Sequence, residues 1–242
     1  MRPILVIGDV HLKHRIAERI VERFPDHTKI FLGDYFDDFG DSAQDNIDTA
    51  RWLQRSLEDP LRIHLMGNHD FHYWQWSPDN KLYCSGFTWA KFDAINSVLT
   101  TKDWDGLRYT HHEAGWWFVH AGLTLDWFAH PILGITPRGV EQIIQRDIEG
   151  VHAGIFPQAI WSADFYRGGR NRRGGCVWND WRNLDSIPGV RQVVGHTPHD
   201  VIMCKYGEDG LVDRICADCH LNEVLLIEDQ TFEIRSVAAI LK

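Results

Sequence analysis

Short apolar runs recur along the chain, and each is followed within a few residues by glycine and by Asp, Asn or His. The runs cover residues 4–7, 29–32, 62–66, 116–118 and 190–194, and they are rich in β-branched and aromatic residues. Such runs are typical of buried β-strands. Because strand ends at one edge of an open α/β sheet collect ligands, we expect the polar residues after these runs to form one site.

The polar residues after the runs form short signatures. They are Gly8-Asp9-Val10-His11, Gly33-Asp34-Tyr35-Phe36-Asp37, Gly67-Asn68-His69-Asp70, Val119-His120-Ala121-Gly122 and Gly195-His196-Thr197-Pro198. A single Gly-Asp pair after a strand is more often a turn, and a single histidine is more often part of the core. Their joint occurrence after separate strands favours a shared chemical role.

Between the predicted strands, apolar residues recur at helical spacing. The sets are Ile16, Ile20, Val21 and Phe24; Ile47, Ala50, Leu53 and Leu57; and Val140, Ile143, Ile144 and Ile148. Thr136 and Pro137 before the last set are a favourable helix start. Residues 211–215 and 223–227 predict two more strands beside turns, which suggests a second, antiparallel sheet packed on the first. The pattern therefore predicts an α/β fold.

Composition and charge narrow the class of protein. The chain has 242 residues without a linker, repeat or low-complexity block, which predicts one domain over residues 1–242. Its formal net charge of −9 disfavours binding to bulk nucleic acid. No apolar run approaches the roughly 20 residues that span a bilayer, and no signal peptide precedes the first strand, so we expect no membrane association and a cytoplasmic location. The oligomeric state stays open.

The five cysteines do not predict a disulfide framework, because their number is odd and no secretion signal is present. The segment Cys216-Ala217-Asp218-Cys219-His220 matches the attachment sequence of c-type haem. We reject haem attachment, because it belongs to exported chains and this segment connects two predicted core strands.

The signatures offer carboxylate, imidazole and amide ligands without a thiolate. This set suits manganese, iron or zinc better than calcium or magnesium. The candidate ligands are Asp9, His11, Asp34, Asn68, His120 and His196. They are too many for one catalytic ion that must also hold water, so we expect two divalent ions that share a carboxylate. Manganese is favoured, with iron or zinc as alternatives.

In this order, the signatures resemble those of the calcineurin-like metallophosphoesterase superfamily, in particular its phosphoprotein phosphatase and diadenosine tetraphosphatase branch. The resemblance implies two facing mixed β-sheets flanked by helices. It places Asp9, His11 and Asp34 on a first ion. It places Asp34, Asn68, His120 and His196 on a second, with Asp34 as the bridge. Pro198 stands where the phosphodiesterase and nuclease branches carry a histidine, which favours the phosphatase branch.

The expected chemistry is in-line attack on phosphorus by a metal-bridging hydroxide, without a covalent phosphoenzyme. His69 is the expected proton donor to the leaving alkoxide, because its neighbour Asn68 is a predicted ligand. By the resemblance, Asp37 orients His69 and favours its protonated form. Asp70 is the alternative partner of His69.

The sequence departs from the resembling phosphatases at the positions of two phosphate-binding arginines. Asp38 follows the second Asp of the Gly-Asp motif, and Met66 precedes Gly-Asn-His. We therefore expect the substrate's phosphate to be bound by an arginine of the Arg- and Gly-rich segment 167–182. Arg182 is the first choice, because nearby tryptophans would restrain it, and Arg167 is the second.

Three functions fit these observations. The favoured one is a phosphatase for phosphomonoesters, with phosphoserine or phosphothreonine in proteins as a candidate substrate. The second is a nucleotide or dinucleoside polyphosphate hydrolase, if the aromatic segment 71–76 stacks a nucleobase. The third is a metal-binding scaffold with little catalysis, suggested by the missing arginines. The complete ligand set and the pair of His69 with Asp37 favour catalysis on a phosphorylated substrate.

Overall fold

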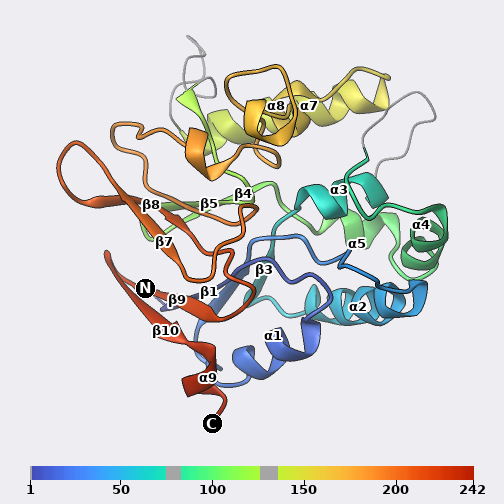
Figure 1. Cartoon of the computed structure of the whole chain (residues 1–242), viewed down its shortest axis with the longest axis horizontal. Helices are drawn as coiled ribbons and strands as arrows, with labels where there is room; N and C mark the ends of the chain where they lie inside the picture. Colours follow the sequence, from blue (N-terminus) through green and yellow to red (C-terminus); the bar gives the residue numbers. More distant parts are fainter. Residues whose placement is uncertain (1, 75–82, 126–135) are drawn as a thin grey trace.

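A computed structural model describes residues 2–74, 83–125 and 136–242 of the chain. The described part contains two five-stranded sheets, ordered β10-β9-β1-β2-β3 and β4-β5-β6-β8-β7 (Figure 1). The strands of the first sheet are β1 (Ile4–Ile7), β2 (Thr28–Phe31), β3 (Arg62–His64), β9 (Glu223–Glu228) and β10 (Thr231–Ser236). Those of the second are β4 (Thr110–Glu113), β5 (Trp116–Val119), β6 (Gln192–Val194), β7 (Met203–Tyr206) and β8 (Val212–Cys216).

Both sheets are mixed. In the first, β1, β2 and β3 are parallel, while β9 runs antiparallel to both β1 and β10. In the second, β5, β6 and β8 are parallel, and β4 and β7 are antiparallel edge strands. The parallel strands of each sheet therefore end at a common edge, which is where the predicted site residues follow them.

Helices and short 3-10 turns connect and cover the sheets. They are α1 (His14–Val21), α2 (Ala43–Ser56), α3 (Asn68–Trp74), α4 (Trp89–Asn96), α5 (Thr101–Asp105), α7 (Pro137–His152), α8 (Gln158–Trp161), η1 (Phe165–Arg167), η2 (Trp181–Asn183) and α9 (Val237–Ile240). In Figure 1, α1 and α2 lie beside the first sheet, while α7 and α8 lie beside the second. No helix among the described residues is long and apolar enough to cross a membrane.

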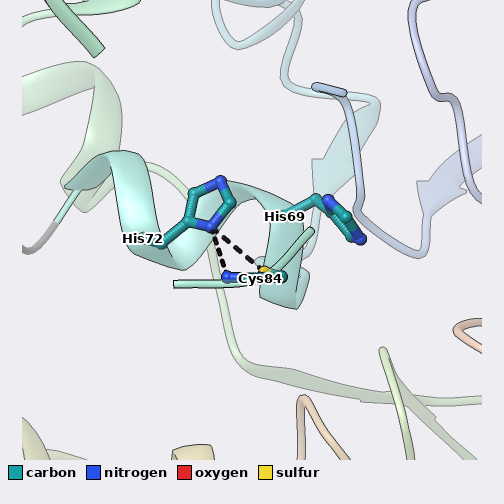
Figure 2. Close-up of side chains that lie close together, drawn as sticks. All are labelled: His69, His72 and Cys84. Carbon is teal, nitrogen blue, oxygen red and sulfur yellow. Dashed lines mark hydrogen bonds between the residues drawn. The ribbon is translucent and has the colours of Figure 1, made fainter. Parts of the chain in front are cut away.

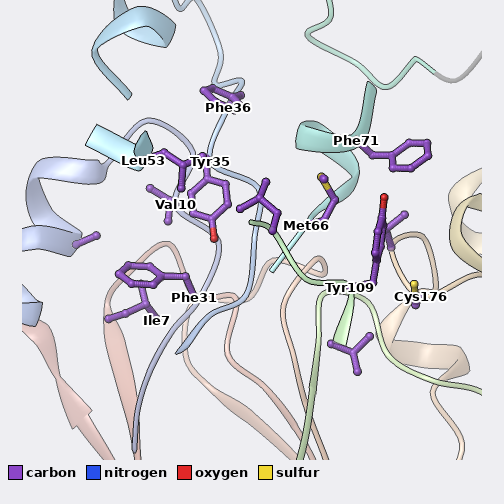
Figure 3. Packing of buried hydrophobic residues seen from close by; sticks show 14 of the residues in the cluster. Ile7, Val10, Phe31, Tyr35, Phe36, Leu53, Met66, Phe71, Tyr109 and Cys176 are labelled. Carbon is purple, nitrogen blue, oxygen red and sulfur yellow. The ribbon is translucent and has the colours of Figure 1, made fainter. Parts of the chain in front are cut away.

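Alternation along the strands separates two apolar layers. Ile4 and Val6 of β1 face the second sheet and pack in one buried cluster with Trp116 and Phe118 of β5. Leu5 and Ile7 face the other way, into a cluster that includes residues of α1 and α2. Figure 3 shows part of this second cluster. Because side chains of a strand alternate between its two faces, each central strand is buried on both sides.

The predicted helices form as α1, α2 and α7, and side-chain caps explain the starts of α2 and α7. Ser42 caps α2 in a reciprocal capping box with Asp45. Thr136 caps α7 through the backbone N–H of Gly139, with Pro137 at the first helical position. In α2 and α7, the capping residues and the helical spacing of apolar residues therefore favour the same structure.

The sequence-based prediction for the two C-terminal strands was wrong in one respect. Residues 211–215 and 223–227 do form strands, β8 and β9, but they do not share an antiparallel sheet. The chain crosses from one sheet to the other between them, so β8 pairs with β6 and β7 while β9 pairs with β1 and β10. Both strands are apolar on the inner side, and such a pattern does not identify the sheet that a strand joins. The five cysteines are free in the structure.

Replacing Glu18 by Gln is expected to lower the free energy of unfolding by about 1 kcal/mol at neutral pH. Glu18 accepts hydrogen bonds from both terminal nitrogens of Arg62, at 2.6 and 2.7 Å, and one from Trp52. These bonds, led by those from Arg62, lower the pKa of Glu18. The stabilisation is therefore present above the ordinary Glu pKa and is lost as pH falls through the lowered value.

Urea unfolding of the wild type and the Glu18→Gln variant at several pH values between 7 and 4 measures this difference. We expect the gap between the two proteins to narrow as the solution becomes more acidic. The exposed Glu22, just after the same helix, provides the control, and Glu22→Gln should change little at any pH. A gap that is constant with pH would contradict the assignment.

Candidate functional site

The predicted site residues lie just beyond the carboxyl ends of parallel strands from both sheets. Asp9 and His11 follow β1, Asp34 follows β2 and Asn68 follows β3. In the second sheet, His120 and His196 come immediately or shortly after β5 and β6. Because the two sheets face one another, their loops meet at one end of the sandwich.

Two groups of potential metal ligands share Asp34. The first group is Asp9, His11 and Asp34, and the second is Asp34, His120 and His196. Within each group the ligand atoms all lie within 4.8 Å of one another. The carboxylate oxygen Oδ2 of Asp34 is 3.7 Å from Nε2 of His11 and 3.4 Å from Nε2 of His120. Oδ2 of Asp34 therefore lies near histidines of both groups of potential ligands.

Asn68 completes the second group. Its Oδ1 is 3.0 Å from Nε2 of His120 and 2.7 Å from Nδ1 of His196. The other end of its amide, Nδ2, lies 3.5 Å from the sulfur of Cys84. The amide oxygen is thus directed to the same point as the two imidazoles.

The tautomers of two histidines leave ring nitrogens free for an ion. Nδ1 of His11 donates to the backbone carbonyl of Asp37 at 2.7 Å, and Nδ1 of His120 donates to that of Leu32 at 2.8 Å. The Nε2 lone pair of each ring is then directed toward Asp34. Metal-ligating histidines commonly have their second ring nitrogen fixed in this way. This donor set fits divalent ions.

Asp9 lies buried among other carboxylates of the site. Burial, and then the carboxylates of Asp218 and Asp34, raise the pKa of Asp9 well above its usual value. Such a cluster of acids is costly unless positive charge balances it. Bound divalent cations would supply that charge.

Glycines of the signatures are required by close packing against these acids. A Cβ atom on Gly67 would lie 2.1 Å from Oδ1 of Asp34, and one on Gly195 would lie 2.1 Å from Oδ1 of Asp9. In addition, His11, Asp34 and His196 adopt positive φ angles of 38°, 50° and 67°. Such angles are uncommon outside glycine and tend to cluster at functional sites.

Asp70 holds the backbone of the site rather than pairing with His69. Its carboxylate accepts hydrogen bonds from the backbone N–H groups of Asp34, Tyr35 and Gly67, each at 2.8 Å. Burial, followed by the charge of Asp34, raises the pKa of Asp70 to about 7. Asp70 therefore joins the loop after β2 to the loop after β3.

His69 pairs with Asp37, as the resemblance implied. Nδ1 of His69 donates to Oδ2 of Asp37 at 3.0 Å. Burial would lower the pKa of His69, but the carboxylates of Asp34 and Asp37 outweigh it and raise the pKa. The ring also makes an edge contact with His11, at 5.3 Å between centroids. His69 is thus held at the rim of the potential metal ligands in a charge environment that favours its protonated form.

Asp37 is itself fixed by donors that the sequence did not reveal. Its Oδ1 accepts from the hydroxyl of Tyr73 at 2.6 Å and from the ammonium of Lys91 at 3.0 Å. Nε2 of His72 lies 3.2 Å from its Oδ2. Burial would raise the pKa of Asp37, but its hydrogen bonds to His69, His72 and Tyr73 hold it well below the usual value.

His69, His72 and Cys84 also lie close together, and hydrogen bonds account for this arrangement. Nδ1 of His72 accepts from the backbone N–H of Cys84 at 3.1 Å and lies 3.1 Å from its sulfur (Figure 2). The Cys84 thiol donates to the backbone carbonyl of Asn68 at 3.1 Å. Burial raises the pKa of Cys84 well above its usual value, so the sulfur stays a thiol. This cluster supports α3 and does not need an ion.

A cavity of about 440 Å³ opens over the potential metal ligands. His11, Asp34, Asn68, His69 and His196 line it. So do Asp37, Asp38, Phe39, Arg167, Trp178 and Asp218. Its lining therefore combines the predicted ligands, the His69–Asp37 pair and two aromatic residues.

The two candidate arginines differ in position. Arg167 lines the cavity, where Asp180 binds its Nε at 3.0 Å and Thr197 accepts from its Nη2 at 2.8 Å. Arg182 is not among the described residues that line this cavity. Its guanidinium is bound to Asp180 and covers the ring of Tyr166. The choice between them depends on the path of the loop, which composition alone does not give.

The aromatic segment after the Gly-Asn-His-Asp signature is largely inside the protein. Phe71, His72 and Tyr73 belong to α3 and are fully buried, while Trp74 packs against Phe71 and His152. Residues 75 and 76 lie outside the described residues. Phe71 to Tyr73 therefore offer no surface for a nucleobase, whereas the fully exposed Phe39 at the cavity does.

Asp218 is a cavity residue that the sequence reasoning missed. It follows β8, a strand parallel to β5 and β6, so it reaches the same edge as His120 and His196. Its position after an apolar strand was a usable signal. The resemblance of this segment to a haem attachment sequence drew attention to the cysteines instead.

Comparison with known proteins identifies the family. The sequence model described as calcineurin-like phosphoesterase matches residues 2–225. No curated protein matches the sequence. Among solved structures, a point mutant of a cold-active protein tyrosine phosphatase aligns with a TM-score of 0.62 and 14% identity, covering 98% of this chain and 78% of that chain.

Two further structures share the fold. A protein described as a candidate diadenosine tetraphosphatase aligns with a TM-score of 0.54 and 15% identity, over 97% of this chain and 93% of that chain. A protein serine/threonine phosphatase from Saccharomyces cerevisiae with similarity to human phosphatase PP5 aligns with a TM-score of 0.53 and 14% identity. The alignment covers 97% of this chain and 79% of that chain. At these identities the comparison shows the fold alone, and it confirms two facing mixed sheets flanked by helices.

Replacing Gly195 by Ala is expected to weaken manganese binding by about tenfold or more, because the new methyl group would displace the Asp9 carboxylate. Calorimetric titration with Mn²⁺ measures the affinity, and circular dichroism checks that the variant is folded. Gly150→Ala in α7 is the control, because a Cβ there meets its nearest neighbour at an ordinary 3.5 Å. Equal manganese affinity in the two folded variants would contradict the packing argument.

Proposed function

The chain belongs to the calcineurin-like phosphoesterase family, and on that basis we propose that it is a phosphatase that hydrolyses phosphomonoesters with two divalent metal ions. The observation that carries the proposal is the convergence of two ligand groups on one carboxylate, Asp34. Metal-dependent hydrolysis of phosphoric esters follows from the family. The number of ions and the ester class are our inference from the site.

In this proposal Asp9, His11 and Asp34 hold one ion. Asp34, Asn68, His120 and His196 hold the other. The mixed oxygen and nitrogen donors favour manganese, with iron or zinc as alternatives. When bound, such ions would supply a nucleophilic hydroxide near neutral pH and would stabilise charge on the phosphoryl oxygens.

The protein's own groups orient the substrate and move a proton. Nδ1 of His69 is occupied by Asp37, which leaves the Nε2 proton of the imidazolium for the departing oxygen. Arg167 binds the phosphate in preference to Arg182, because only Arg167 among these two lines the cavity. Asp180 and Thr197 restrain its guanidinium, so little side-chain freedom is lost on binding.

A second candidate function is hydrolysis of nucleotides or dinucleoside polyphosphates. Phe39 and Trp178 favour it, because they place aromatic surface at the cavity. A scaffold without catalysis is less consistent with the site. A protein that only binds metal has no chemical need for a protonated imidazole held by Asp37 at the ligand cluster.

A substrate panel with added Mn²⁺ tests the proposed function. We expect turnover of p-nitrophenyl phosphate and of phosphopeptides, and a loss of about 10²–10³-fold or more in kcat/KM for Asp34→Asn, because both ligand groups lose a charge. Asp93→Asn on the exposed side of α4 is the matched control. Exclusive turnover of nucleotides or dinucleoside polyphosphates would support the second function. No turnover of any panel member, with metal binding intact, would refute both.

The role of His69 predicts a dependence on the leaving group. The His69→Gln variant should lose about 10²–10⁴-fold in kcat with alkyl phosphates, because their alkoxides need a proton. The loss should be much smaller with p-nitrophenyl phosphate, whose leaving group departs as a stable anion. His27→Gln, in the turn before β2, should behave as wild type. An equal loss of activity on both substrates would show that His69 acts in some other way.

A further inference from the structure

A second cavity of about 440 Å³ lies apart from the potential metal ligands. Arg146 of α7, Gln158 of α8, Ser162 and the loop residues Asn171, Arg172 and Arg173 are part of its lining. It shares no described lining residue with the first cavity. All the charged side chains in its described lining are arginines, and this lining includes no Asp or Glu.

Three arginines, Arg146, Arg172 and Arg173, line this cavity in a chain whose net charge is −9. Arg173 is oriented by an ion pair with Asp185 at 3.2 Å. The ion pairs between described residues include neither Arg146 nor Arg172. Asp185 offsets the charge of Arg173, whereas an anion bound beside Arg146 and Arg172 would offset theirs. Guanidinium groups match the oxygens of phosphate in geometry.

The floor of this cavity is a fixed part of the protein. Gly174 and Gly175 are buried, and a Cβ on Gly175 would lie 2.4 Å from the carbonyl oxygen of Ile160. The N–H of Gly174 donates to Asn179, and that of Gly175 donates to the carbonyl of Ser162. This part of the lining is therefore fixed by backbone packing and does not depend on side-chain rotamers.

The same loop connects this cavity to the first one. Arg167 at its beginning lines the first cavity, while Arg172 and Arg173 line the second. The buried carboxylate of Asp164 accepts from the backbone of Arg167 and from the side chain of Asn183. Asn183 in turn donates to the carbonyl of Arg172. The carboxylate of Asp164 therefore connects Arg167 directly, and Arg172 through Asn183.

We propose that the cavity of Arg146, Arg172 and Arg173 is a second phosphate site. Its ligand is a phosphate group other than the one that is hydrolysed. That group belongs either to a substrate with more than one phosphate or to a separate phosphate-bearing anion. Binding at this site does not depend on the proposed function, whereas the assignment to a substrate rests on it and narrows it to multiply phosphorylated esters.

Calorimetric titration of the metal-free full chain with inorganic pyrophosphate tests the binding site. We expect saturable binding that is retained in Asp34→Asn and Arg167→Gln. The double variant Arg146→Gln/Arg172→Gln should lose at least about tenfold in affinity, since two charged hydrogen-bond donors are removed. Arg170→Gln is the matched control, because this exposed arginine of the same loop lines neither cavity. No binding to the wild type, or an equal loss in the control, would overturn the proposal.

Kinetics then distinguish the two sources of the phosphate. If the substrate supplies it, the double variant should raise KM for a doubly phosphorylated peptide and leave KM for p-nitrophenyl phosphate unchanged. If a separate anion supplies it, pyrophosphate should alter turnover of p-nitrophenyl phosphate, at fixed free Mn²⁺, in the wild type and not in the double variant. A protein without phosphatase activity that still binds pyrophosphate through these arginines would refute the proposed function alone.

Discussion

The carboxylate of Asp70 is the constraint on which the site depends. It binds three backbone N–H groups from the loops after β2 and β3, and it thereby fixes the positive φ angle of Asp34. A further hydrogen bond joins the same two loops, because Oδ1 of Asp34 accepts from the backbone N–H of His69 at 2.9 Å. Hydrogen bonds from both aspartates therefore hold the two loops together. The relative positions of Asp34, Asn68 and His69 follow from this pair of aspartates before any ion is bound.

The sequence indicates those site residues whose position follows from their place along the chain. Each predicted ligand lies in the loop after an apolar strand, and parallel strands bring such positions to one edge. The partners of Asp37 could not be predicted in this way. Lys91 reaches it from α4, far along the chain, and the sequence around His72 and Tyr73 does not indicate which side chain these two residues contact. Only the packing of α3 and α4 shows that these residues all contact the carboxylate of Asp37.

Long-range topology explains the remaining errors in prediction. The pattern of β8 and β9 gave two strands correctly, but the crossover between sheets is set by which apolar faces meet, and many arrangements bury the same residues. Asp218 does follow an apolar strand, but its place at the site also depends on β8 running parallel to β6. The path of the loop around Asp180 likewise decides that Arg167, and not Arg182, lines the cavity.

The two departures from the family pattern have a common physical consequence. Met66 is 1% exposed and packs in the core near Phe71 (Figure 3), so an arginine there would bury an unpaired charge. Asp38 adds a carboxylate to the cavity instead of a cation. Asp180 pairs with Arg167 and also with Arg182, so it offsets only part of the charge of Arg167. In the proposed function, a phosphate dianion in this cavity would have its charge offset by Arg167 together with divalent ions. The protein would then depend on these ions more than a phosphatase with two free arginines at this site would.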